Sequence, residues 1–442
     1  MVTRLLAVLA VGWLTCSCSP SARSEDSEAL VLHGFQLVDV ETRSVREQDV
    51  VIESGVITAR PTRTKRRVIE GHGRYLLPAL WDLKASLWGN DSALNWDVLT
   101  QQANFTQCLG FQLYYGVAHV GVFAMDREWV ERELKRADAL ELAAAEPLYP
   151  DKVIGSKADF GCDEARDSAA ARRALDQRAA HGVPLITISY TGPGGPTPGV
   201  SRAVLSELLN RAGAHHLPAF VLVDDWAGAA EAVELGASVI YGLPEGRMPD
   251  ALIASMHARG VAFAPALSGF LELNRLLGND QALADPFLTP TVSGPVLDSY
   301  RSERTLWQEW RPVLQRGRAR QAVSLESVAR AAQAGVHIVV VSDAGWVAAA
   351  FQGYSNHAAQ AWLERAGLDA WSRLAAATIW PAAVVGRRVG FEAGQSADFL
   401  ALDADPRQAA QNLRKIAWVM RRGRLVNREK LLPDLTRGLY QP

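Results

Sequence analysis

The feature that most constrains the fold is an alternation of short apolar runs with helical stretches along the middle of the chain. Helical patterns such as 168–181 and 227–235 lie between the runs, and Gly182 and Gly236 follow them directly before the next run. Glycine just past a helix end supplies a left-handed residue at little steric cost. Strands that alternate with helices at this spacing predict a parallel sheet. The expected strands are 80–83, 117–122, 185–189, 219–223, 239–241, 262–264 and 338–341.

Seven or eight such units over roughly 300 residues favour a closed (β/α)8 TIM barrel over an open sheet. Short β-branched runs also occur before and after this region, at 30–40, 49–57 and 67–78 and again at 397–402 and 416–426, and they are typical of antiparallel strands. Neither terminal set can bury a core alone. We therefore expect one β-sandwich-like domain built from residues 30–78 and 383–431, with the barrel spanning 79–382.

The first eighteen residues have the pattern of an export signal. Arg4 is their one charged side chain, and an apolar run then leads to Thr15-Cys16-Ser17-Cys18. A cysteine in this place indicates bacterial lipoprotein processing, with Cys18 as the expected acylated residue and Cys16 as the second candidate. Residues 19–29 are then a polar tether, and the protein is placed in the periplasm or cell envelope, attached to the membrane by its lipid. Secretion without lipid is the alternative.

The net charge and the cysteine content argue against some classes of partner and of structural metal site. The 442-residue chain has a net charge of −2, which disfavours a nucleic-acid partner because phosphate binding needs a concentrated basic face. Beyond the signal, Cys108 and Cys162 could form one disulfide or remain as two buried thiols. No Cys-x-x-Cys spacing occurs, which argues against a structural zinc.

Four stretches, in order and spacing, resemble the metal-dependent amidohydrolases, in particular the imidazolonepropionase and prolidase-like branch. The resemblance extends from about Leu30 to Val426. It implies the barrel and composite β-domain described above, and a hydrolase that acts on C–N bonds with a bound divalent metal. The stretches are 74–82, 227–237, 339–345 and 375–383, the last continued by 392–402.

The same resemblance implies where the metal ligands should lie. The family takes a His-x-His from strand one, a carboxylated Lys or Glu from strand four, one His each from strands five and six, and an Asp from strand eight. A catalytic zinc needs about three protein ligands, yet only Asp343 matches here. We therefore expect no cofactor and no zinc or other divalent metal. The other ligand places hold Lys84, Ser86, Thr187, Leu222 and Tyr241.

Lys84 is the informative replacement, because a charged ammonium has no lone pair to offer a metal. In the family fold its place and that of Asp343 face the same point. We expect the Lys84 ammonium to neutralise Asp343 in the absence of a metal, which makes these two residues the catalytic candidates. A nitrogen more than about 6 Å from both Asp343 oxygens would contradict the pair. The alternative is that Lys84 extends to solvent.

Further residues are expected to line a binding pocket at the mouth of the barrel. Trp88, Tyr190 and Trp346 follow strand ends, where aromatic side chains suit ligand stacking, although core packing is their alternative role. His357 occupies a place where the family often has a pocket histidine, and a helix-terminal histidine with a local hydrogen bond is equally expected. The metal-ligand places Ser86, Thr187, Leu222 and Tyr241 complete this pocket.

Three functions follow from the sequence. The first is an exported, metal-free, non-hydrolytic member of the family, a pseudoenzyme or a scaffold for a small molecule or protein partner. The second is an enzyme with Asp343 as general base and Lys84 as its partner. The third is a C–N hydrolase whose metal is held by other ligands. The sequence names neither a substrate nor an oligomeric state.

Overall fold

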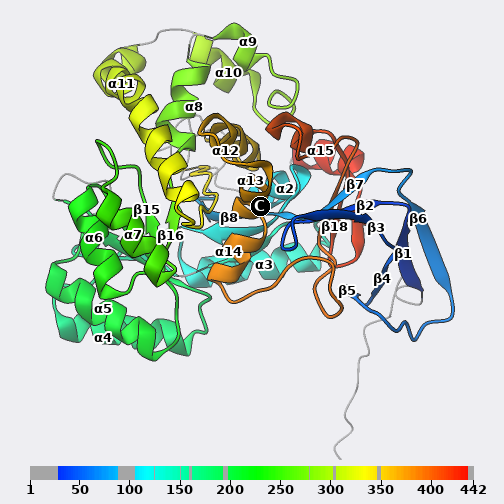
Figure 1. Cartoon of the computed structure of the whole chain (residues 1–442), viewed down its shortest axis with the longest axis horizontal. Helices are drawn as coiled ribbons and strands as arrows, with labels where there is room; N and C mark the ends of the chain where they lie inside the picture. Colours follow the sequence, from blue (N-terminus) through cyan, green and yellow to red (C-terminus); the bar gives the residue numbers. More distant parts are fainter. Residues whose placement is uncertain are drawn as a thin grey trace, which may run out of the picture.

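The computed structural model describes residues 28–87, 105–123, 125–149, 151–158, 162–192, 198–277, 279–301, 305–345 and 350–436. The expected lipidation site Cys18 and the expected pocket residues Trp88 and Trp346 lie outside these ranges. In Figure 1 the strands of the two chain ends gather on one side of the molecule, and the alternating strands and helices form the larger part.

The β-domain contains a four-stranded sheet, in the order β5-β4-β1-β6, and a six-stranded sheet, in the order β19-β18-β17-β7-β2-β3. The second sheet mixes strands from both ends of the chain, as predicted. β1 pairs with β6, and β2 with β7, in parallel rather than the expected antiparallel sense, because each pair is connected through intervening strands. The strands are β1 (Ala29–His33), β2 (Gln36–Asp39), β3 (Ser44–Glu47), β4 (Val50–Glu53), β5 (Val56–Ile57), β6 (Arg66–Glu70), β7 (Tyr75–Pro78), β17 (Phe399–Leu402), β18 (Ile416–Arg421) and β19 (Arg424–Val426).

The central strands all pair in parallel, in the orders β10-β9-β8 and β12-β11-β13-β14-β15-β16. Parallel strands with helical crossovers are the predicted α/β class. The sequence analysis missed β10, β11 and β12, whose three residues in each case include a proline, a glycine or charged side chains rather than a continuous apolar run. The strands are β8 (Leu80–Ala85), β9 (Val117–Val122), β10 (Glu146–Leu148), β11 (Val153–Gly155), β12 (Cys162–Glu164), β13 (Ile186–Tyr190), β14 (Ala219–Val223), β15 (Val239–Tyr241) and β16 (Ala262–Ala264).

The segment at 338–341 joins the two groups of strands. The Val339 amide donates to the Phe263 carbonyl at 2.8 Å, and the Leu83 amide donates to the Val340 carbonyl at 3.2 Å. This segment therefore lies between β16 and β8, where the eighth strand of a β/α barrel belongs. Within the described ranges no ladder connects β10 to β12, so the ring is hydrogen-bonded through the 338–341 segment and open between those two strands.

Helices cover the strands from outside (Figure 1). Gly236, with φ of 103°, ends α6 in the left-handed conformation that the sequence predicted. Across the described part of the chain, no helix combines the length and apolarity needed to cross a bilayer. The helices are α2 (Phe105–Tyr114), α3 (Arg127–Ala139), α4 (Ser168–Ala180), α5 (Arg202–Ala214), α6 (Trp226–Leu235), α7 (Asp250–Arg259), α8 (Ser268–Leu276), α9 (Asp280–Leu283), α10 (Gly294–Arg301), α11 (Thr305–Gln333), α12 (Tyr354–Arg365), α13 (Ala370–Ala376), α14 (Ile379–Val384), η2 (Ala410–Arg414) and α15 (Arg428–Thr436).

The interior of the barrel is a packed apolar core. Strand residues alternate between the two faces of a sheet, and Leu185, Phe220, Val239 and Val341 belong to one buried cluster inside the strands. Residues two positions further along share their face. This alternation places Thr187, Leu222, Tyr241 and Asp343 on the interior side, as the sequence predicted.

Candidate active site at the barrel mouth

Lys84 lies near the carboxyl end of β8 and is almost completely buried, with 2% of its side chain exposed. Its Nζ donates to Asp343 Oδ1 at 2.5 Å. The register between β8 and β9 shifts between Asp82 and Ala85, so regular alternation does not determine where Lys84 points. The contact expected between Lys84 and Asp343 is present, and the alternative of a lysine extended to solvent is wrong.

Asp343 follows the 338–341 segment and has a left-handed backbone, with φ of 54°. Asparagine and aspartate tolerate this conformation better than most residues. Its amide donates to the Lys84 carbonyl at 3.1 Å, which ties the two chain segments together through the backbone as well. The side chain is therefore held where the carboxyl ends of β8 and β15 meet.

Tyr241 completes the cluster from β15. Its phenol donates to Asp343 Oδ1 at 2.7 Å. Burial, and then the Asp343 charge, raise the pKa of Tyr241 well above its ordinary value, so the phenol remains a donor. Lys84 Nζ lies 4.2 Å from the ring centre of Phe123 and 4.6 Å from that of Tyr241, within the range of a cation–π interaction.

Asp82 is a buried acid beside this cluster that sequence reasoning did not single out as a site residue. Its Oδ1 accepts from the amides of Ser342 at 3.0 Å and Lys84 at 3.1 Å. Burial raises its pKa to about 7, with a smaller contribution from the Asp343 charge. The sequence feature that could have pointed to Asp82 is an acidic residue within the apolar run of the first barrel strand, two residues before Lys84.

Ser86, Thr187 and Leu222 are all buried. The Ser86 amide donates to the Ala344 carbonyl at 2.7 Å, and its carbonyl accepts from Gln352 Nε2 at 2.8 Å, which fixes the chain after β8 against the segment that carries Asp343. Thr187 is 3% exposed, and Leu222 packs in the apolar barrel core.

Tyr190 and His357 form their hydrogen bonds with residues outside the Lys84 cluster. Tyr190 donates to Glu231 on α6, and burial raises its pKa to about 12. His357 Nε2 contacts the Tyr115 carbonyl at 2.8 Å, and burial lowers its pKa to about 3, which keeps the ring neutral. The partner of His357 is distant in sequence, so its hydrogen bond is not the local one considered from the sequence.

The comparisons with known proteins agree with this architecture. The family model described as "Amidohydrolase family" matches residues 312–426, from within α11 to β19. The C-terminal part of the chain, residues 312–426, is therefore similar to the amidohydrolase family. No curated protein sequence matches the chain.

Solved structures with amidohydrolase architecture cover nearly all of the chain. Molinate hydrolase has a TM-score of 0.70 at 16% identity, covering 92% of this chain and 96% of its own. A Xaa-Pro dipeptidase with bound methionine has a TM-score of 0.66 at 17% identity, covering 90% and 100%. A putative prolidase from Bifidobacterium longum has a TM-score of 0.66 at 19% identity, covering 93% and 99%. At these identities the likeness concerns the fold.

The side chains at the mouth do not fit the divalent metal that amidohydrolase chemistry implies. The described residues contain no group of three or more His, Cys, Asp or Glu placed to hold a metal ion. The one carboxylate in a ligand place, Asp343, already accepts from Lys84 and Tyr241. A charged lysine beside it would repel a second cation.

Proposed function

We propose that this protein, which has an amidohydrolase-like fold, does not work as a metallohydrolase and instead binds a ligand at the barrel mouth. The observation that carries the proposal is the 2.5 Å contact between Lys84 Nζ and Asp343 Oδ1 in a buried site. In this arrangement the ammonium compensates the carboxylate charge, which is the electrostatic task that a metal would otherwise perform.

The chemistry of the donor set supports a non-hydrolytic role. Metal-dependent amide hydrolysis relies on a metal that lowers the pKa of a bound water and polarises the carbonyl. The site offers one carboxylate, one ammonium and one phenol, and all three are engaged with one another. A set of groups that satisfy each other is suited to shaping a pocket wall.

C–N bond hydrolysis is the second candidate function. It is favoured by the likeness of the fold to molinate hydrolase and to a Xaa-Pro dipeptidase. In this case Asp343 acts as a general base with Lys84 as its electrostatic partner, or a metal is held by residues outside the described ranges. Amides, cyclic amides and dipeptides are the substrates to test.

Metal analysis combined with turnover assays separates these functions. We expect purified full-length protein to contain far less than one equivalent of zinc, manganese or nickel, and to hydrolyse none of these substrates after metal addition. One equivalent of metal, or hydrolysis that metal addition restores, would overturn the proposal. Hydrolysis without metal that Asp343→Ala abolishes, and that the exposed control Asp403→Ala retains, would establish the second candidate.

Export and lipidation are a separate proposal, supported by the pattern of residues 1–18. We expect radiolabelled palmitate to be incorporated into the full-length protein made in a bacterial host, and Cys18→Ala to abolish this labelling. Labelling that persists in Cys18→Ala but disappears in Cys16→Ala would move the site to Cys16. An absence of label in both the wild type and the variants would refute lipidation.

A further inference from the structure

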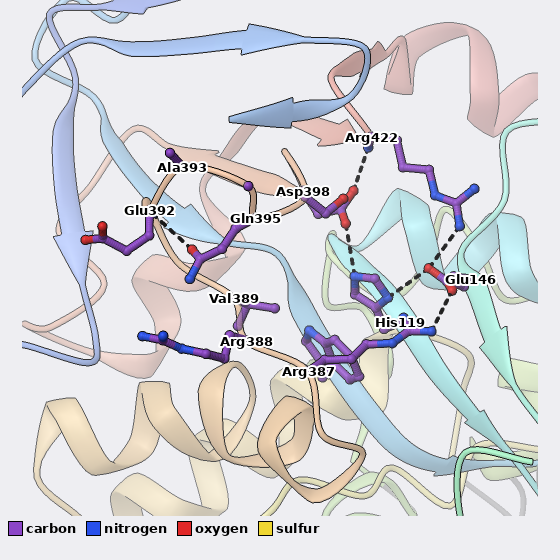
Figure 2. A pocket seen from close by; sticks show the side chains of 13 residues that line it. His119, Glu146, Arg387, Arg388, Val389, Glu392, Ala393, Gln395, Asp398 and Arg422 are labelled. Atoms are coloured by element: carbon purple, nitrogen blue, oxygen red, sulfur yellow. Dashed lines mark hydrogen bonds and ion pairs between the residues drawn. The ribbon is translucent and has the colours of Figure 1, made fainter. Parts of the chain in front are cut away.

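A second pocket lies between the β-domain and the barrel, toward the opposite end of β8 from Lys84. It has a volume of about 620 Å³, within the range of roughly 300–1,000 Å³ that is typical of small-molecule sites. Trp81 of β8 and Glu146 of β10 form its barrel side, and the segment 387–396 with Arg422 forms the other side (Figure 2).

Guanidinium groups gather around Glu146 on one side of the pocket, whose lining also includes the carboxylates of Glu392 and Asp398. Glu146 Oε1 lies 3.0 Å from Arg387, and its Oε2 lies 3.4 Å from Arg422 and 4.0 Å from Arg421. His119 approaches the same carboxylate at 3.4 Å (Figure 2). The Glu146 carboxylate therefore faces three guanidinium groups and the His119 imidazole, which a second carboxylate, Asp398, also contacts at 3.2 Å.

The effect of this crowding is visible at Arg421. Burial lowers the pKa of Arg421, and the neighbouring Arg422 charge lowers it further. The Arg421 Nε also has no hydrogen-bond acceptor within the described part of the chain. An added anion near these guanidinium groups would reduce their mutual repulsion.

The pocket also has apolar walls and another unpaired donor. Trp81 and Val389 line it, and the guanidinium carbon of Arg387 lies 5.9 Å from the centre of the Trp81 ring. Trp81 is 1% exposed, and its Nε1 has no acceptor among the described residues. A ligand with an apolar body and an oxyanion group would complement both kinds of surface.

We propose that this pocket binds a small organic oxyanion, a carboxylate or a phosphate ester, independently of the barrel mouth. The anionic group pairs with the guanidinium groups of Arg388 and Arg422, which contact Glu41 and Glu146 at 3.4 Å and are 74% and 60% exposed, so that solvent reaches them. The apolar body lies against Trp81 and Val389. This site lies apart from the Lys84 cluster and does not depend on its function.

Calorimetric titration of the full chain with benzoate, phenyl phosphate and neutral benzyl alcohol tests the proposal. We expect at least one of the two anions to bind with one-to-one stoichiometry, and benzyl alcohol to bind at least about 10-fold more weakly. Preference between benzoate and phenyl phosphate identifies the head group. Failure of both anions to bind, or equal binding of benzyl alcohol, would refute the proposal.

Three variants locate the binding site. Arg422→Gln should weaken anion binding about 10-fold, because it removes one charged pair. Arg247→Gln, which removes an arginine from an exposed pair with Glu326 elsewhere, should bind as the wild type does. Tyr241→Phe at the barrel mouth should also leave binding unchanged. If Arg422→Gln binds normally, or if Tyr241→Phe abolishes binding, the assigned pocket is wrong.

Discussion

Lys84 and Asp343 are hydrogen-bonded to each other twice, once through their side chains at 2.5 Å and once from the Asp343 amide to the Lys84 carbonyl at 3.1 Å. The pair thus joins the end of the first barrel strand to the chain directly after the 338–341 segment, which links the two groups of parallel strands. A contact of this kind contributes to both the electrostatics and the architecture of the barrel mouth.

Asp343→Asn should lower the free energy of unfolding by roughly 3–5 kcal/mol, because it leaves the buried Lys84 ammonium without a counter-charge. The double variant Lys84→Met with Asp343→Asn removes both charges and should lose less stability than either Asp343→Asn or Lys84→Met alone. Urea unfolding of the four proteins measures the coupling. A double variant whose losses simply add would show that the pair carries no mutual stabilisation.

Tyr241→Phe should lower the free energy of unfolding by about 1.5–3 kcal/mol, the range for a hydrogen bond to a charged group. The change removes the donor 2.7 Å from Asp343 and retains the ring that flanks Lys84. Tyr190→Phe, which removes a phenol from the partly exposed Glu231 contact, is the control and should lose less. Equal losses in urea unfolding would contradict a special role for the Tyr241 hydrogen bond.

The ion pairs around His119 predict a specific dependence of stability on pH. Burial acts to raise the pKa values of Glu146 and Asp398, but His119 lowers both, together with Arg387 at Glu146 and the Arg422 backbone amide at Asp398, so that both lie below their ordinary values. For a carboxyl group with a depressed pKa, the stabilisation is present above its unfolded pKa, about 4, and is lost as the pH falls through the folded pKa. The wild type should therefore lose stability steadily below about pH 4.

His119→Gln should show a shallower loss of stability over that acidic range, because its carboxylates have lost a cationic partner. The variant also loses the stack of His119 on Trp81, with ring centroids 4.1 Å apart, which lowers its stability at every pH. The quantity to compare is therefore the slope of the free energy of unfolding against pH. His33→Gln, which breaks an exposed pair with Asp49, is the control. Identical slopes in wild type and His119→Gln would contradict the assignment.

Gly345→Ala should lower the free energy of unfolding by more than the roughly 1–2 kcal/mol of left-handed strain alone. Gly345 has φ of 72°, and an added Cβ would overlap the Ser86 carbonyl oxygen. Gly367 has φ of 87° with no atom within 4 Å of the added Cβ, so Gly367→Ala reports the strain without the overlap. Thermal unfolding of both variants should rank Gly345→Ala as the less stable.

The resemblance to the amidohydrolases directed attention to these residues, because it assigns ligand places to the ends of several strands. It implied the positions of Thr187, Leu222 and Tyr241, and it implied that Lys84 and Asp343 face each other. The phenol of Tyr241 as a donor to Asp343 did not follow, since the contact depends on the distance between β15 and the 338–341 segment. Asp82 was not singled out as a site residue, because its contact with the Ser342 amide depends on how closely β8 and the 338–341 segment pack.

The contacts of His119 could not be predicted from the sequence. The structure places it 3.2 Å from Asp398 and 3.4 Å from Glu146. Asp398 belongs to the other end of the chain, so no local pattern indicates this bridge between the β-domain and the barrel. Cys108 and Cys162, for which two outcomes were open, are both free thiols.

The pairing of β7 with β17 in the β-domain has a consequence for how the chain unfolds. These strands immediately precede the first barrel strand and follow the last barrel helices, so their ladder closes the whole barrel into one long loop. Holding the ends of a long loop together restricts the freedom of every segment within it. Separation of β7 from β17 would release both ends of the barrel at once. We therefore expect the β-domain and the barrel to unfold together, and a truncation that removes either one to destabilise the other.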